Sequence, residues 1–272
     1  MKIPHRLRWG ASILLLKNYS SYFEMKKSIF FVSDAHLGFD NLDVEAYRTS
    51  LLLGFLEHVE KNGRELIILG DLFDFWFEYK SVVPRKYFNI LFALKHMCDQ
   101  NIKIHYVTGN HDFWMNNFWG EQIGVIVHKN PFEFESNEKK FYINHGDGLA
   151  KKDVGYRILK RILRHPFNVR LFRLIHPDFG FAAARFFSKM SRNHRIFQDE
   201  DSEYIDFAKT RFKEGFDYVL MGHTHRPCVY HEKGQIYVNT GDWIDHFSYA
   251  EFDGDRLMLK YWRKNSPKVK PS

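Results

Sequence analysis

Residues 29–36, IFFVSDAH, join an apolar run to a short polar segment, DAH, whose residue types can bind divalent metals. We call such a segment a tail, and the arrangement recurs four more times along the chain. Apolar or β-branched runs at residues 66–69, 102–108, 141–144 and 218–221 lead into GD, GNHD, HGD and GHTH. Short apolar runs that stop at Gly or Asp are typical of buried strands followed by loops. In an open α/β sheet, functional groups collect at the carboxyl ends of the strands. We therefore expect seven side chains to converge there: Asp34, His36, Asp71, Asn110, His145, His223 and His225.

The rest of the pattern predicts a layered α/β core. Residues 51–59 and 84–98 carry apolar side chains at helical spacing. Four alternating segments separated by turn residues favour a meander of strands at residues 228–231, 235–239, 248–252 and 256–261. Strands that alternate with helices, and that end in polar residues, indicate layers of helix and sheet over residues 25–148 and 206–263.

Positive charge is concentrated between the fourth and fifth tails. Residues 149–198 hold 12 Lys or Arg and only two acidic residues, Asp153 and Asp178, so this window carries +10 in a chain of net charge +7. Its Leu, Ile and Phe residues recur at helical spacing, which predicts a basic helical lid over residues 149–205. Such helices fit an anionic membrane surface, or an ordinary subdomain with solvated charges. Nucleic acid is not expected as a partner, because no nucleic-acid motif accompanies the basic residues.

The bulk composition fits a cytoplasmic globular protein. Hydrophobic residues make up 44% of the chain, and no segment approaches the roughly 18 consecutive apolar residues of a membrane-spanning helix. Cys98 and Cys228 form no CxxC pattern, so a disulfide framework is not expected. Residues 1–24 are predicted to be a flexible N-terminal extension, with Met25 as an alternative start, and the polar residues 264–272 a disordered tail.

The seven converging side chains favour a centre with two metal ions. Imidazole and carboxylate ligands suit Mn, Fe or Zn, and the absence of thiolates argues against a structural zinc site. Two ions about 3.5–4 Å apart need a bridging carboxylate, a role that suits Asp71. His111 follows Asn110 and is a candidate proton donor to the departing oxygen, with Asp112 as the carboxylate that orients it. The alternative for His111 is a packing residue beside the metals.

The series DAH, GD, GNHD, HGD and GHTH resembles that of the calcineurin-like metallophosphoesterases over about residues 29–252. This resemblance implies a four-layer αββα sandwich of two sheets flanked by helices. It also implies in-line attack of water on phosphorus, with two cations neutralising the charge that builds on the phosphoryl oxygens. One ion would be held by Asp34, His36, Asp71 and His225, and the other by Asp71, Asn110, His145 and His223.

Longer motifs resemble the UDP-2,3-diacylglucosamine pyrophosphatases of lipid A biosynthesis, namely GDLFDFW at residues 70–76, HGDGLAKKDVGY at residues 145–156 and GHTHRP at residues 222–227. This resemblance implies Mn²⁺-dependent hydrolysis of UDP-2,3-diacylglucosamine to UMP and 2,3-diacylglucosamine 1-phosphate. It places the enzyme in the cytoplasm, peripherally on the inner face of the bacterial inner membrane, with the lid covering the acyl chains. Substrate-side positions of the family are matched by Asp153, Tyr156, Arg192, Asn193 and His194.

The GNHD tail differs from the pattern of this narrower family, whose best-known enzymes carry Arg at the position of His111. The alternative function is therefore a phosphodiesterase or phosphatase for soluble nucleotides or another phosphoester. A non-catalytic scaffold is less favoured, since every ligand position is filled. A nuclease is less favoured because no nucleic-acid motif accompanies the basic segment.

Overall fold

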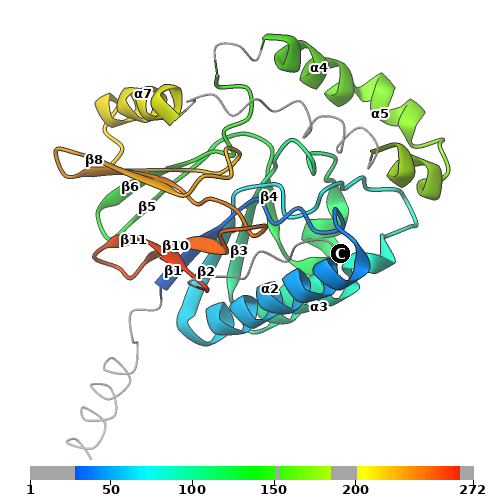
Figure 1. The fold of residues 1–272 in the computed structure, drawn as a ribbon, viewed down its shortest axis with the longest axis horizontal. Coiled ribbons are helices and arrows are strands. Elements are labelled where there is room, and N and C mark those ends of the chain that lie inside the picture. Colours follow the sequence, from blue (N-terminus) through cyan, green and yellow to red (C-terminus); the bar gives the residue numbers. More distant parts are fainter. Residues whose placement is uncertain (1–27, 151–153, 185–200, 264–272) are drawn as a thin grey trace, which may run out of the picture.

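Two β-sheets packed face to face form the centre of the computed structural model, which describes residues 28–150, 154–184 and 201–263 (Figure 1). The six-stranded sheet has the order β11-β10-β1-β2-β3-β4, with strands β1 (Ser28–Val32), β2 (Gly63–Ile68), β3 (Lys103–Val107), β4 (Ile126–His128), β10 (Ser248–Phe252) and β11 (Leu257–Tyr261). The five-stranded sheet has the order β5-β6-β7-β9-β8, with strands β5 (Phe132–Ser136), β6 (Lys139–Ile143), β7 (Tyr218–Met221), β8 (Cys228–Glu232) and β9 (Gln235–Asn239). Strands β1 to β4 are mutually parallel, as are β6, β7 and β9.

The central strands are apolar on both faces, which explains their continuous apolar sequences. Along β1, Phe30 and Val32 pack in the cluster beneath helices α2 (Leu42–Asn62) and α3 (Phe88–Asp99). The alternate residues, Ile29 and Phe31, pack between the sheets. Successive side chains of a strand point to opposite faces, so a single apolar run supplies both layers.

Helix α7 (Asp201–Lys213) covers the outer face of the five-stranded sheet. Tyr204, Ala208 and Phe212 recur at four-residue spacing and are buried against the sheet residues Tyr142 and Tyr237. The layers therefore run α7, five-stranded sheet, six-stranded sheet, then α2 with α3 (Figure 1). The predicted four-layer αββα class is confirmed.

The predicted meander of four strands is wrong. Strands β8 and β9 form a hairpin in the five-stranded sheet, whereas β10 and β11 form a hairpin in the six-stranded sheet. Residues 240–247 cross from one sheet to the other. Alternation marks a strand and its buried face, but it does not identify the neighbouring strand. Strands β4 and β5 were not predicted, although FEFES in β5 alternates apolar and charged residues.

Helices α4 (Val154–Arg164) and α5 (Pro166–Phe172) lie beyond the strand ends and are called the arm below (Figure 1). Large exposed apolar side chains of the arm and of the turn and helix that follow are Ile158, Leu159, Ile162, Leu163, Phe167, Leu171, Leu174, Ile175 and Phe179. Within the described ranges, no helix has the length and apolar character needed to span a bilayer. The predicted extension, the tail, and lid residues 151–153 and 185–200 lie outside the described residues.

Candidate metal centre

Five loops at the carboxyl ends of β1, β2, β3, β6 and β7 meet at one edge of the two sheets. The six-stranded sheet contributes Asp34, His36, Asp71 and Asn110, and the five-stranded sheet contributes His145, His223 and His225. The structure brings these seven predicted residues together in two adjoining groups.

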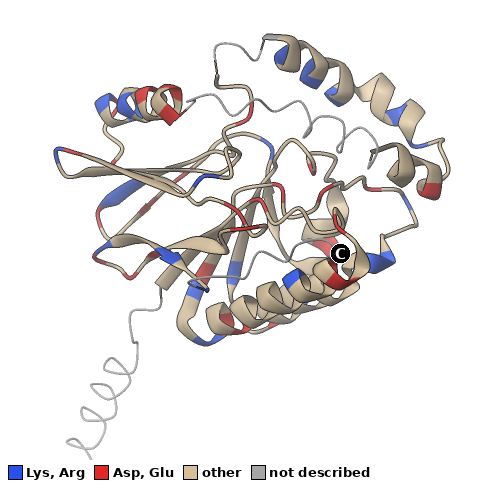
Figure 2. Cartoon of the chain, viewed as in Figure 1, with Lys and Arg blue, Asp and Glu red and all other residues tan. Residues whose placement is uncertain are grey.

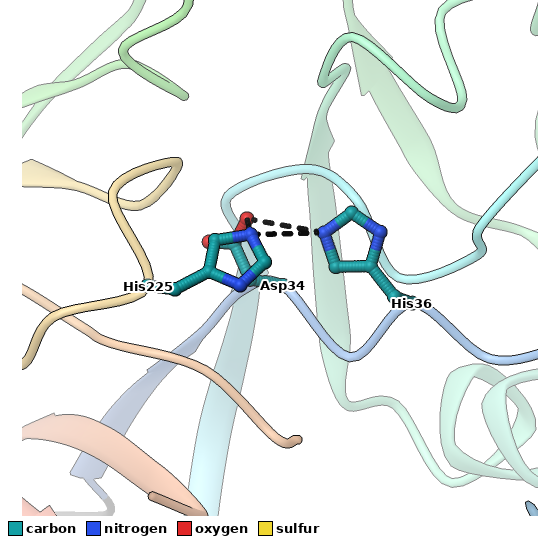
Figure 3. A group of neighbouring side chains, drawn as sticks. All are labelled: Asp34, His36 and His225. Atoms are coloured by element: carbon teal, nitrogen blue, oxygen red, sulfur yellow. Dashed lines mark hydrogen bonds and ion pairs between the residues drawn. The ribbon is translucent and has the colours of Figure 1, made fainter. Parts of the chain in front are cut away.

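The first group contains Asp34, His36 and His225, whose side chains point toward one another (Figure 3). The Nε2 atoms of His36 and His225 lie 3.6 and 3.4 Å from Asp34 Oδ1, and 3.2 Å from each other. Asp71 Oδ2 lies 3.6 Å from His36 Nε2. Both carboxylate oxygens are buried and accept no hydrogen bond from the described residues. Since buried polar atoms are normally satisfied, this group of lone pairs fits a cation.

The second group contains Asp71, His145 and His223. His145 Nε2 lies 3.3 Å from Asp71 Oδ2 and 3.1 Å from Asn110 Oδ1. Asp71 Oδ2 thus faces histidines of both groups, which is the position that a bridging carboxylate would occupy between two ions. The residues present therefore fit a pair of divalent metal ions.

The backbone of these loops is strained. A positive φ is uncommon outside glycine, because the side chain crowds the backbone. Residues in sparsely populated conformations cost on the order of 1–3 kcal/mol each and cluster at functional sites. Five of the seven predicted ligands have this geometry: Asp34 (φ 54°), His36 (43°), Asp71 (53°), His223 (70°) and His225 (60°).

Two glycines make room for the carboxylates. A Cβ at Gly109, in the GNHD tail, would overlap the Asp71 carboxylate. A Cβ at Gly222, in the GHTH tail, would overlap Asp34 Oδ2. In these two tails, the glycine that precedes the predicted ligands therefore makes room for a predicted ligand from a neighbouring loop.

The electrostatics of the centre favour positive charge. Burial opposes protonation of His36, but the nearby carboxylates of Asp34, Asp74 and Asp71 raise its pKa to about 9. Burial likewise opposes protonation of His145, yet Asp71 raises its pKa to about 10. Burial would raise the pKa of Asp71, but the neighbouring histidines hold it well below its usual range. In the metal-free protein, protons on His36 and His145 balance the negative charge that divalent ions would balance, and metal binding would displace these protons.

His111 lies against the first group, with its ring 4.7 Å from that of His36 in an edge-to-face arrangement. Its Nδ1 donates to the backbone carbonyl of Asp74 at 2.8 Å, and its backbone N–H donates to Asp71 Oδ1 at 2.8 Å. Because Nδ1 carries the donated proton, Nε2 is the nitrogen left to contact a substrate. Burial lowers the pKa of His111.

The predicted contact between Asp112 and His111 is wrong. Asp112 is fully buried, and its two oxygens accept from the backbone N–H groups of Leu72 and Gly109 and from the Tyr106 hydroxyl. The carboxylate is therefore committed to holding the β2 and β3 loops together. The carbonyl of Asp74 orients His111 instead.

Tyr156 joins the arm to the HGD loop. Its hydroxyl donates to Asp147 Oδ2 at 2.6 Å, and Lys160 Nζ lies 2.6 Å from the same oxygen. Arg164 Nη2 donates to the carbonyl of Gly109 at 3.1 Å. The other predicted substrate residues, Asp153, Arg192, Asn193 and His194, lie outside the described residues.

Two buried carboxylates near the centre were not predicted. Asp74 Oδ1 lies 3.6 Å from His36 Nδ1, and Asp242 Oδ2 lies 3.8 Å from His225 Nδ1. Asp242 follows β9 in the sequence NTGD, so it repeats the strand-then-GD pattern of Asp71. That repetition was the available sequence signal for Asp242.

Comparison with known proteins finds a family and several bacterial relatives. Residues 27–227 match the model of the calcineurin-like phosphoesterase family. A UDP-2,3-diacylglucosamine hydrolase of Porphyromonas gingivalis is 30% identical, covering 87% of this chain and 98% of its own. A protein of the same name from Nitrosococcus oceani is 28% identical, covering 74% of this chain and 80% of its own. Another, from Neisseria meningitidis serogroup B, is 27% identical, covering 86% of this chain and 97% of its own.

Proposed function

The chain belongs to the calcineurin-like phosphoesterase family, and from this premise we propose that it hydrolyses UDP-2,3-diacylglucosamine in lipid A biosynthesis. The products are UMP and 2,3-diacylglucosamine 1-phosphate. The observation that carries the proposal is the pair of ligand groups that share Asp71 beside a basic, apolar arm. The full-length similarity to UDP-2,3-diacylglucosamine hydrolases supports this substrate over other phosphoesters.

Two divalent ions are assigned to the centre, with Mn²⁺ expected and Fe or Zn as alternatives. When bound, they polarise the phosphoryl group and activate water for attack. We define site A by the ligands Asp34, His36, Asp71 and His225. Site B is defined by the ligands Asp71, Asn110, His145 and His223.

His111 is assigned to the departing oxygen through its Nε2. An anhydride releases a phosphate, whose second pKa is about 6, so it needs a hydrogen bond and positive charge more than a full proton. Either Arg or His meets that requirement, which makes the GNHD tail compatible with pyrophosphate hydrolysis. An ordinary ester releases a far more basic alkoxide and needs a true proton donor. His111 is the residue that favours a soluble phosphodiester as the second candidate substrate.

The arm is assigned to the lipid part of the substrate and to the membrane surface. Its cations stand on helices whose apolar side chains are exposed, which is the composition of a helix that lies on anionic headgroups (Figure 2). The contacts of Tyr156 and Lys160 with Asp147 place this surface next to the HGD loop. The enzyme would then work peripherally on the inner face of the bacterial inner membrane. The predicted substrate contacts are Asp153, Tyr156, Arg192, Asn193 and His194.

The test is release of UMP from UDP-2,3-diacylglucosamine in detergent micelles, measured with added Mn²⁺. Chelated protein and protein carrying Asp71→Ala serve as inactive controls. A soluble phosphodiester is assayed in parallel under the same conditions. Turnover of the diester without release of UMP would replace the lipid substrate with the second candidate.

A further inference from the structure

We propose that an open pocket at the end of the arm binds the phosphate group of an anionic membrane lipid. The pocket has a volume of about 670 Å³ and lies between two segments of the chain. Residues 79–82, which follow the β2 loop, line one wall, and residues from the range 170–177, at the end of α5 and in the turn after it, line the other. The proposal rests on the membrane contact of the proposed function and names a site and a ligand chemistry for it.

Aromatic packing holds the two walls together. The ring of Phe77 lies 4.8 Å from that of Tyr79 and 4.7 Å from that of Phe172 in α5, measured between centroids. Gly180 makes room for the Tyr79 hydroxyl, since a Cβ at this glycine would lie 2.7 Å from that oxygen. The pocket is therefore a packed junction between the core and the arm rather than the exposed face of a single helix.

Positive charge enters the pocket from both walls. Lys80 comes from the core segment, whereas Arg170 and Arg173 come from α5 and the turn after it. None of the ten described residues that line the pocket is acidic. The same three cations form no ion pair with a carboxylate of the described residues. Unpaired cations on two sides of a concave surface attract an anion.

Two carboxylates beside the pocket leave this charge in place. Asp178 lies 3.8 Å from Nδ1 of the lining residue His176, but its side chain is 93% exposed, so water screens it. Glu78 precedes the core wall, and its two oxygens accept the backbone N–H groups of Asn116 and Phe118. The pocket therefore keeps a net positive charge.

Two buried donors in the pocket walls have no partner. Arg173 Nε and the Tyr79 hydroxyl are shielded from solvent and make no hydrogen bond to any described residue. Buried polar atoms are normally satisfied. A guanidinium offers its donors in a planar fork that matches a phosphate group, so Arg173 is the expected centre of the site.

Apolar side chains beside these donors favour a lipid over a free anion. Val82, Leu174 and Ile175 line the same pocket and are exposed. An anionic lipid offers a phosphate and apolar chains together, and basic pockets recognise such headgroups. A single-stranded nucleic acid needs aromatic platforms for its bases. Tyr79 is the only Phe, Tyr or Trp among the described lining residues, and its hydroxyl is buried.

Variants on the two walls test whether both belong to one site. On the arm side, Arg170→Gln and Arg173→Gln are made singly. Arg161→Gln is their matched control, because it removes an exposed cation of α4 outside the pocket. On the core side, Ser81→Glu adds a negative charge at an exposed position of the wall, and Ser81→Ala is its neutral control.

The probe is dihexanoyl phosphatidate, a soluble lipid, titrated into the full-length chain by calorimetry with and without Mn²⁺. We expect a saturable site that is present without Mn²⁺, because no lining residue is a predicted metal ligand. The two arm variants and Ser81→Glu should each weaken binding by about fivefold or more, and the two controls should stay within about twofold. Sedimentation with phosphatidylcholine vesicles that contain phosphatidate should decrease most for the three pocket variants.

Four results would overturn the proposal. Equal losses for Arg173→Gln and Arg161→Gln would show diffuse surface charge rather than a site. Equal affinity for inorganic phosphate and for dihexanoyl phosphatidate would make the ligand a free anion. Binding that requires Mn²⁺ would place the probe at the metal centre. Tighter binding of a short single-stranded RNA, lost in the same variants, would make the partner a nucleic acid.

Folding and function are controlled separately. Thermal melts identify any variant that fails to fold, and Ser81→Glu, at an exposed loop position, then provides an independent measurement. Absence of UMP release with intact binding of dihexanoyl phosphatidate would reject the proposed substrate and leave this inference standing. Release of UMP by a chain that shows no such binding would reject this inference alone.

Discussion

The metal-centre loops and the arm are in direct contact, yet they are built in opposite ways. In the loops, carboxylates and imidazoles are buried and the backbone is forced into left-handed geometry. In the arm, apolar side chains are exposed, and α5 contains no buried residue. Phe172 of α5 anchors the arm, because its ring packs against those of Phe77 and Trp114 at centroid distances of 4.7 and 5.6 Å. We propose from this contrast that the buried loops set the chemistry and that the sparsely attached arm sets the choice of substrate.

The largest expected effect is that of Asp71→Ala. The substitution removes the oxygen that faces His36 and His145, so both ions should bind weakly and UMP release should fall below detection. Metal content by mass spectrometry checks this directly. Two ions retained at wild-type affinity would show that Asp71 is not the bridge.

His111→Ala should separate turnover from metal binding. The ring contacts His36 only by its edge, so we expect both ions to remain while kcat falls by about 10²–10⁴. Steady-state kinetics and metal analysis of the same sample provide the measurement. His231→Ala, at an exposed strand position, is the control. A parallel loss of metal and activity would make His111 a structural residue.

Tyr156→Phe should act on substrate binding rather than on chemistry. The substitution deletes the hydroxyl that donates to Asp147 and so helps to hold the arm against the HGD loop. A hydrogen bond to a charged group contributes about 1.5 kcal/mol, which is roughly a tenfold change in the equilibrium between the attached and detached arm. We expect KM for the lipid substrate to rise by about that factor, with kcat within twofold. A drop in kcat alone would contradict the separation of the two regions. Tyr261→Phe, at a distant exposed position, controls for loss of a tyrosine.

Metal binding should release protons at neutral pH. His36 and His145, whose pKa values are raised to about 9 and 10, carry protons in the metal-free protein at pH 7.5. A metal must displace these protons, so its apparent affinity should increase as the pH rises toward 9 and the release should diminish. Calorimetry in buffers of different ionisation enthalpy counts the protons. Zero release at pH 7.5 would contradict the raised pKa values.

The smallest effect on turnover is expected from the outer apolar residues. Leu174→Ser and Phe179→Ser alter side chains that are 82% and 73% exposed, so stability should change by less than about 0.5 kcal/mol. Micellar kcat should stay within twofold, while sedimentation with vesicles of anionic lipid should decrease. Vesicles of neutral lipid are the control. Unchanged sedimentation would remove the turn and helix that follow the arm from the membrane contact.

The parts of the molecule that could be predicted are those determined by a local pattern. The apolar runs before Asp34 and Asp71 identified strands with two buried faces, and the polar residues after them identified side chains that gather in the candidate metal centre. The meander failed because the neighbours of a strand depend on the sheet that it joins: β9 pairs with β7 and β8, whereas β10 pairs with β1 and β11.

The parts that could not be predicted depend on the folded geometry. The sequence GNHD places Asp112 next to His111, but the backbone carries the two side chains in different directions, so the expected pair does not form. The left-handed backbone at the predicted ligands could not be predicted from composition, because Asp and His adopt positive φ more often than most non-glycine residues but are still only occasionally found there. Asp74 approaches His36 only through tertiary packing.

The division of ligands between two sheets has a mechanical consequence. Asp34 and His36 extend from one sheet and His225 from the other, so an ion at site A would act as a cross-link between the halves of the sandwich. An ion at site B would do the same through Asn110 and His145. Metal supply would therefore govern how long the folded chain withstands proteases, as well as how fast it turns over. Starvation for the ion would reduce the amount of enzyme together with its activity.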